Sequence, residues 1–182
     1  MAAKIQQRNE VVNRQCVELQ ARLAADGLWS SILKGQGVAS LYSEHLRGLR
    51  QSGDIDVYVD CGMEKAMEYA RKMFGEVAYD YINAHLPIYT DTEVELHWRI
   101  GYMVNLFKNR KLQGWVKSHE DSVFGGDACL EAGEITVPTA EFNAFYILLH
   151  AFNHVNSERL GLRQLMDYYF VLIDYKTKTI KS

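Results

Sequence analysis

The clearest strand signals in the chain are stretches in which apolar and polar residues alternate. Asp54–Asp60 places its Ile and Val side chains on one face and the carboxylates of Asp54 and Asp56 on the other. Thr92–Trp98 alternates in the same way and turns Glu95 toward its polar face. Both stretches are therefore predicted to be half-buried strands that carry carboxylates on the side away from the core.

The remaining apolar residues predict helices and further strands. Residues at helical spacing predict helices over 3–25, 36–44, 62–75, 103–115, 139–155 and 158–175. Further strands are predicted at 28–33, 77–82, 86–89 and 135–137, with loops at 45–53 and 117–133. This order predicts an α+β protein, in which a small mixed β-sheet with packed helices (1–100) precedes a mainly helical region (101–182) packed on it.

Composition and charge narrow the classes of protein. The 182 residues are 48% hydrophobic and 24% charged, which is enough for one globular core. The net charge of −3 makes nucleic acid an unexpected partner. The 3 cysteines lack metal-ligand spacing, and no stretch reaches membrane-spanning length. We therefore expect a soluble, cytoplasmic protein with reduced thiols and no membrane partner.

The carboxylates of Asp54 and Asp56 repel each other unless a cation lies between them. A divalent metal is the candidate cation, and oxygen ligands favour Mg²⁺ or Mn²⁺. Glu95 reaches the pair if its strand is a direct neighbour with its polar face in phase; Glu93 shares that face but is the less favoured ligand. Like-charge repulsion alone predicts that Asp56→Asn leaves the metal-free protein as stable or slightly more stable.

Several short motifs extend this pattern in a fixed order. They are Leu33-Lys34-Gly35, Leu41-Tyr42, Leu49-Arg50, Gly53-Asp54-Ile55-Asp56, Val94-Glu95-Leu96-His97-Trp98, Leu149-His150-Ala151-Phe152-Asn153-His154 and Leu162-Arg163-Gln164-Leu165-Met166-Asp167. In this order they resemble the uncharacterised nucleotidyltransferase family. That family shares the fold of the DNA polymerase β-type nucleotidyltransferases, so the resemblance implies a nucleotidyltransferase-type sheet with a helical C-terminal region.

The resemblance implies transfer of a nucleoside monophosphate from a nucleoside triphosphate to an acceptor hydroxyl, with release of pyrophosphate. Asp54, Asp56 and Glu95 would be the catalytic carboxylates and would hold Mg²⁺ or Mn²⁺. Lys34 and Gly35 would position the phosphates. Arg50 would bind phosphate as well, or else pair with an acid. The acceptor would be a small molecule or a protein.

Two other functions compete with this interpretation. The chain has Gly35-Gln36 where the wider superfamily usually has Gly-Ser or Gly-Gly, which leaves a non-catalytic relative that binds a nucleotide or a partner. A zinc hydrolase built on His150, His154 and Asp167 is the weaker rival, because the His pair lacks the Glu of a His-Glu-x-x-His motif.

The helical region also carries polar residues without an assigned role. Asn153, His154 and Arg163 are candidates to meet the acceptor. Arg163 and Asp167 are four residues apart on one predicted helix and are spaced to pair with each other. His97 shares the carboxylate face of its strand, and its neighbour Trp98 is predicted to lie in the core.

Overall fold

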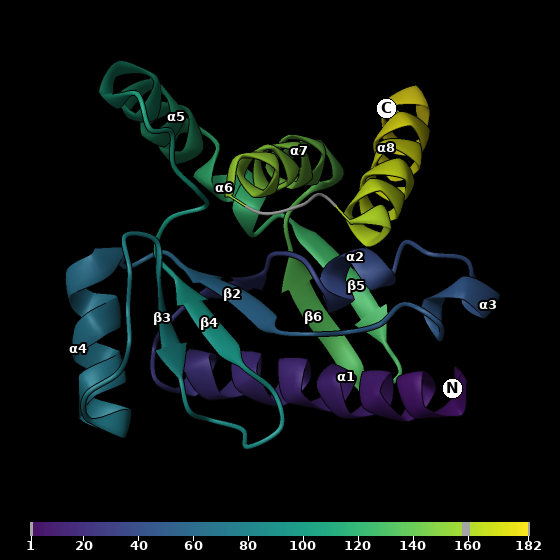
Figure 1. The fold of residues 1–182 in the computed structure, drawn as a ribbon, viewed down its shortest axis with the longest axis horizontal. Helices are drawn as coiled ribbons and strands as arrows, with labels where there is room; N and C mark the ends of the chain where they lie inside the picture. The colour runs from purple at the N-terminus through teal and green to yellow at the C-terminus, as the bar shows by residue number, and fades with distance from the viewer. Residues whose placement is uncertain (1, 158–160, 182) are drawn as a thin grey trace.

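A computed structural model describes residues 2–157 and 161–181 (Figure 1). Of residues 154–157 and 181 it describes the backbone alone. Its helices are α1 (Ala2–Ala25), α2 (Gln36–Ala39), α3 (Glu44–Arg47), α4 (Gly62–Phe74), α5 (Leu106–Ser118), α6 (Glu120–Val123), α7 (Ala140–Ser157) and α8 (Leu162–Lys181). Its strands are β1 (Ser30–Ile32), β2 (Ile55–Val59), β3 (Asn83–Leu86), β4 (Val94–His97), β5 (Gly126–Leu130) and β6 (Gly133–Val137). The predicted α+β class is confirmed.

The main sheet is mixed. In the described part of the chain it has four strands in the order β1-β2-β4-β3. The central strands β2 and β4 are parallel, and β1 and β3 pair with them antiparallel. A parallel pair needs a long crossover connection, which α4 and β3 supply here. A separate antiparallel hairpin, β5–β6, packs against α1 and β1.

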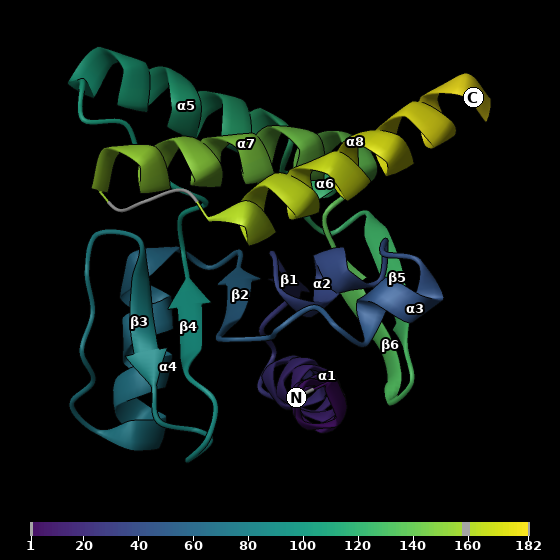
Figure 2. The same cartoon turned by 45° about the vertical axis from the view of Figure 1, so that its right-hand side comes forward.

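The two faces of the main sheet differ in chemistry. The apolar face, which includes Val57 and Leu96, packs against α1 and α4 in one hydrophobic cluster. The opposite face carries the polar side chains of β2, β3 and β4. Figure 2 shows α5, α7 and α8 together on the side of the molecule opposite α1. The polar face of the sheet is therefore turned toward this helical layer, and the apolar face toward α1.

Helix α1 follows directly from its sequence. Val12, Cys16, Leu19 and Leu23 recur every three or four residues and form one buried stripe. The helix ends before Gly27, whose φ of +78° suits a glycine. The helix predicted over 139–155 is likewise confirmed as α7, and Thr139 Oγ1 accepts a hydrogen bond of 3.3 Å from the amide of Phe142 at its start.

Several of the predicted elements are wrong in extent. The helix expected over 36–44 ends at Ala39, where the Ser40 hydroxyl donates to the Gly37 carbonyl at 2.6 Å, and α3 lies in the expected loop. The loop expected over 117–133 contains α6 and β5. The strands expected at 77–82 and 86–89 are replaced by β3.

Polar side chains explain why β3 was missed. Asn83 donates to Glu95 Oε2 at 2.8 Å, and His85 Nδ1 lies 2.7 Å from Glu93 Oε1. These residues interrupt the apolar pattern of the strand because their partners are carboxylates on or next to the neighbouring strand β4.

At the other end of the chain, the predicted helix 158–175 corresponds to α8, and its first residues, 158–160, lie outside the described residues. None of the helices in the described ranges combines the length and the apolar character required to cross a membrane.

We expect Gly37→Ala to destabilise the fold, because α2 approaches β1 and β6 too closely for a side chain. A Cβ at this position would lie 2.9 Å from Val137 Cγ1 and 3.1 Å from the carbonyl oxygen of Ile32. Overpacking of this kind costs about 1–3 kcal/mol. Urea unfolding of the variant measures the loss.

Gly48→Ala is the matched control. Its φ is −66°, and a Cβ there meets no atom within 4 Å. Its free energy of unfolding should stay constant or rise by about 0.4–1 kcal/mol. Equal losses in both variants would contradict close packing at Gly37.

Candidate active site

The parallel pairing of β2 and β4 brings the predicted carboxylates together. In the register of the pair, Asp56 lies directly opposite Glu95. Asp54 precedes β2, and it lines with Glu95 a cavity of about 920 Å³. The predicted adjacency of the two strands, with their polar faces in phase, is therefore confirmed.

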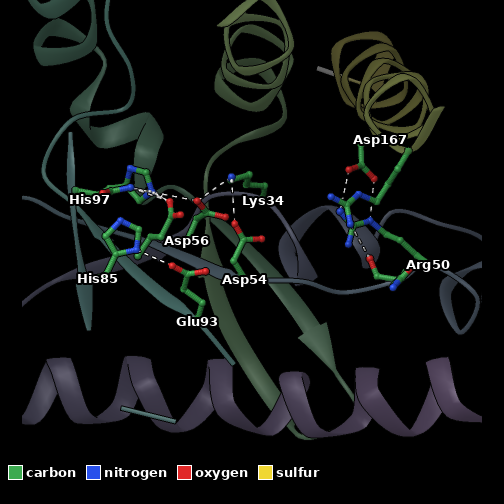
Figure 3. Close-up of polar contacts among 12 residues, drawn as sticks. Lys34, Arg50, Asp54, Asp56, His85, Glu93, His97 and Asp167 are labelled. Atoms are coloured by element: carbon green, nitrogen blue, oxygen red, sulfur yellow. Dashed lines mark hydrogen bonds and ion pairs between the residues drawn. The ribbon is translucent and has the colours of Figure 1, made fainter. Parts of the chain in front are cut away.

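Lys34 provides a positive charge between the aspartates. Its Nζ lies 2.9 Å from Asp56 Oδ1 and 3.8 Å from Asp54 Oδ2 (Figure 3). The Lys34 ammonium thus compensates the repulsion between the two carboxylates, from which the sequence analysis inferred a metal. Replacing Asp56 by Asn would leave the buried Lys34 ammonium without its nearest anion, so a loss of stability is expected instead of the gain that repulsion alone predicts.

His97 completes this charged cluster. Its Nε2 lies 3.0 Å from Asp56 Oδ1 and 3.1 Å from Glu95 Oε2. Burial works to lower the pKa of His97, but the hydrogen bonds to Asp56 and Glu95 outweigh it and raise the pKa to about 9. In the protein alone, His97 is therefore an imidazolium that bridges the carboxylates of neighbouring strands.

The same contacts keep Asp56 ionised. Burial works to raise the pKa of this carboxyl, but the charge of Lys34 and the hydrogen bond from His97 hold it well below its usual range. Burial likewise works to lower the pKa of Lys34, and the charge of Asp56 outweighs it, so that this pKa is raised. The cluster therefore retains its anionic and cationic groups although Asp56 is only 1% exposed.

The site contains a carboxylate oxygen that is free to bind a cation. Asp56 Oδ2 is buried and has no hydrogen-bond partner within residues 2–157 and 161–181. Ligand atoms of Asp56, Glu95 and His97 all lie within 4.8 Å of one another. Carboxylate and imidazole groups are ligands of divalent metals, so these residues fit such an ion. Asp54 lies outside this trio and is turned toward Lys34.

Gly35 and Gln36 differ in role. Gly35 has a φ of +56°, which a glycine adopts without strain, and it lines the cavity beside Lys34. Gln36 is buried and turned to the interior: its Nε2 donates to Asn13 Oδ1, and its Oε1 accepts from Ser52 at 2.6 Å. The glutamine that departs from the superfamily pattern thus connects α1 to the segment that precedes Asp54.

Arg50 forms a buried pair with α8. Its Nε and Nη2 donate to the two carboxylate oxygens of Asp167, each at 2.8 Å, and Tyr42 also donates to Asp167 at 2.7 Å. Of the two roles predicted for Arg50, the structure shows the pairing with an acid. Because both oxygens of Asp167 are bound in this way, the zinc-hydrolase hypothesis loses its carboxylate ligand. Arg163 donates to the Gln51 carbonyl at 3.2 Å, so it and Asp167 have different partners.

The helical layer forms the far wall of the cavity. Its lining includes Tyr146, His150 and Asn153 of α7, Arg163 of α8 and Lys108 of α5. The side chain of His154 lies outside the described part of the structure. Of the acceptor candidates from the sequence, Asn153 and Arg163 are thus placed at the same cavity as the carboxylates.

Asn83 is the site residue that the sequence analysis did not identify. It lines the cavity and donates to Glu95 Oε2 from β3, the strand on the other side of β4 from Asp56. Its signal was hidden because the strand that carries it was predicted at other residues. Trp98, by contrast, is in the core as predicted, and its indole NH donates to the Tyr81 carbonyl at 3.1 Å.

The fold is that of a nucleotidyltransferase-like protein. It is similar to the crystal structure of an antigenic nucleotidyltransferase-like protein from Paracoccidioides brasiliensis, with a TM-score of 0.53 and 14% identity over 87% of this chain and 74% of that one. At this identity the likeness concerns the fold alone. The family follows from the sequence: the chain belongs to the uncharacterised nucleotidyltransferases, whose family model matches residues 1–180. No curated protein matches it significantly.

Breaking the Arg50–Asp167 pair should be costly. The side chains are only 5% and 9% exposed, so Arg50→Met leaves a buried carboxylate without its cation. We expect a loss of about 3–5 kcal/mol in the free energy of unfolding, measured by urea titration. Arg50→Met/Asp167→Leu should recover part of this loss, because no charge is then left unpaired.

The exposed pair Lys178–Asp174 on the same helix serves as the control. Its Lys side chain is 63% exposed, and the residues are four apart. Lys178→Met should cost no more than about 0.3–0.5 kcal/mol. A similarly small loss for Arg50→Met would show that the buried pair does not hold α8 to the rest of the protein.

Proposed function

We propose that this protein is a metal-dependent nucleotidyltransferase that moves a nucleoside monophosphate from a nucleoside triphosphate to an acceptor hydroxyl. One observation carries the proposal. Asp56 and Glu95 face each other across parallel strands, and Asp54, Glu95, Lys34 and Gly35 line one cavity. Family membership supports the transferase class, and the acidic cluster supports the metal dependence.

The phosphate end of the substrate is assigned to Lys34 and Gly35. Lys34 is 17% exposed on its side chain, so its ammonium reaches the cavity while it contacts Asp56. Gly35 carries no side chain, which allows phosphate oxygens to approach its backbone closely. Arg50 lines the same cavity, and we assign it to orient this wall through Asp167, with phosphate contact as its further predicted role.

The carboxylates are assigned to the metal and to proton transfer. Asp54, Asp56 and Glu95 would hold Mg²⁺ or Mn²⁺, which when bound stabilises the charge on the attacking and leaving oxygens. The acceptor oxygen forms a bond to the α-phosphorus as the bond to the bridging oxygen of pyrophosphate breaks. Glu95 receives the proton of the acceptor hydroxyl, and pyrophosphate leaves with the electron pair of the broken bond.

The acceptor is assigned to the wall formed by the helical layer. Asn153 and Arg163 lie there, on the far side of the cavity from the strands. Amide and guanidinium groups bind hydroxyl and anionic groups. The acceptor is therefore a hydroxyl-bearing small molecule or protein segment. A cavity of about 920 Å³ is large enough for a nucleotide beside such a group.

A metal and a non-hydrolysable triphosphate should stabilise the protein together, whereas either alone does little. Ligands that bind only the folded state contribute about 2.7 kcal/mol at a hundred times their dissociation constant. For a chain of this size each kcal/mol raises Tm by about 2–4 °C. Thermal unfolding with Mg²⁺ or Mn²⁺ and each of the four triphosphates measures the effect.

Glu95→Gln and Glu93→Gln form a matched pair for this test. They lie on the same strand face, but Glu93 binds His85 and its side chain is 60% exposed. Glu95→Gln should lose the joint stabilisation by metal and nucleotide, and Glu93→Gln should retain it. A flat response of the unaltered protein to all four triphosphates would count against nucleotide binding altogether.

Turnover separates the enzyme from a non-catalytic relative. With Mg²⁺ or Mn²⁺, one triphosphate and a suitable acceptor, we expect release of one pyrophosphate for each acceptor modified. Glu95→Gln should reduce the rate by a factor of at least about 100, the scale of a general base. Stabilisation by metal and nucleotide without pyrophosphate release, across a broad panel of acceptors, would favour the binding protein.

A further inference from the structure

His97 occupies a position within the carboxylate site that the sequence left without a role. It ends β4 two residues after Glu95, so both side chains project from the same face of the sheet. Figure 3 shows its ring directed at Asp56, with the Lys34 ammonium on the other side of that carboxylate. A single ring nitrogen, Nε2, contacts Asp56 Oδ1 and Glu95 Oε2.

The spacing of these donor atoms suits a common metal ion. Ligands at about 2.0–2.1 Å from an octahedral ion lie about 3.0 Å from their nearest neighbours in the shell. The distances from His97 Nε2 to Asp56 Oδ1 and Glu95 Oε2 are 3.0 and 3.1 Å. Asp54 is not part of this trio, since the compact group of candidate ligands is Asp56, Glu95 and His97.

Two buried atoms of this trio lack protein partners. His97 is 4% exposed and Asp56 is 1% exposed. Among the residues that the structure describes, neither His97 Nδ1 nor Asp56 Oδ2 has a hydrogen-bond partner. Leaving a buried carboxylate oxygen unsatisfied costs free energy, so the unpartnered Asp56 Oδ2 indicates that the site is built for a ligand from outside the chain. His97 Nδ1 is the other nitrogen of the ring whose Nε2 contacts the carboxylates.

A second group of residues that could hold a metal lies on β3 and at the start of β4. His85, Glu93 and Glu95 also present ligand atoms within 4.8 Å of one another. However, His85 and Glu93 are 39% and 60% exposed on their side chains and line a different, more open hollow. Their mutual contact of 2.7 Å is that of a hydrogen bond at the surface. The first trio, of which Asp56 and His97 are buried and Glu95 and His97 line the cavity with Lys34 and Gly35, is therefore the better site.

We infer that His97 is a metal ligand, with Asp56 and Glu95, and that it gives the site a preference for Mn²⁺ over Mg²⁺. The inference rests on the proposed function and specifies its metal. Mg²⁺ favours a shell made of oxygen ligands, whereas an imidazole nitrogen favours transition metals, and Mn²⁺ accepts carboxylates as well. His97 thus takes the place in the metal shell that the proposed function gave to Asp54, which contacts Lys34 and lines the cavity.

Pulsed electron paramagnetic resonance of bound Mn²⁺ tests the inference without any turnover. The experiment uses the full chain with Mn²⁺ and inorganic triphosphate, which contains no nitrogen, so a ¹⁴N coupling reports a protein ligand. The variants are His97→Gln, His85→Gln for the outer group, and His45→Gln as an exposed control on α3. The ratio of the Mg²⁺ and Mn²⁺ dissociation constants is measured for each.

We expect ¹⁴N coupling in the unaltered protein, in His85→Gln and in His45→Gln, and no coupling in His97→Gln. The preference for Mn²⁺ should fall at least about tenfold in His97→Gln alone. If circular dichroism shows that His97→Gln does not fold, His97→Asn replaces it in both measurements.

Three results would overturn the inference. Loss of the coupling in His85→Gln would place the ion in the outer group. Bound Mn²⁺ without ¹⁴N coupling would reduce His97 to a hydrogen-bond partner of the carboxylates, while pyrophosphate release would still support the proposed function. Failure of Mn²⁺ to bind would refute the ligand role of His97, and failure of Mg²⁺ to bind as well would refute the metal dependence of the proposed reaction.

Discussion

The parallel pairing of β2 with β4 is the constraint on which the site depends. This register places Asp56 opposite Glu95 and, one position earlier and later, Ile55 opposite Val94 and Val57 opposite Leu96. A slip by one residue would exchange the polar and apolar faces of β4 and turn Glu95 into the cluster packed on α1 and α4. The hydrophobic core therefore fixes the site geometry, because burial of the apolar face selects the register.

Electrostatics places a second condition on the site. A carboxylate as buried as that of Asp56 is costly unless cations and hydrogen bonds compensate its lost hydration. Lys34 at 2.9 Å and His97 at 3.0 Å supply this compensation. Each comes from a different strand end, so β1, β2 and β4 are bound together by charge as well as by their backbone hydrogen bonds. A metal entering the site would have to compete with Lys34 for Asp56.

The sequence predicted those parts of the structure that local spacing of apolar residues determines. The strands that carry Asp56 and Glu95, their faces and the helix α1 follow from local patterns of apolar residues, and the order of the motifs identified the family. The strand β3 could not be found in this way, because Asn83 and His85 interrupt its apolar pattern and contact carboxylates of another segment of the chain, Glu95 and Glu93. Nor could the Arg50–Asp167 pair, which joins residues 117 positions apart and is formed only when α8 packs.

The chemistry of the sheet also explains why a cavity exists at all. An apolar helix laid directly on the polar face would bury the carboxylates and imidazoles without water or partners, at a high cost in free energy. The helical layer instead contacts this face through the aromatic side chain of Tyr58, two residues after Asp56, and the rest of the protein through the Arg50–Asp167 pair. The volume of about 920 Å³ left between them is bordered by charged strand residues on one side and by polar and aromatic helix residues on the other. The residues assigned to the metal thus also keep open the space into which the nucleotide and acceptor are proposed to bind.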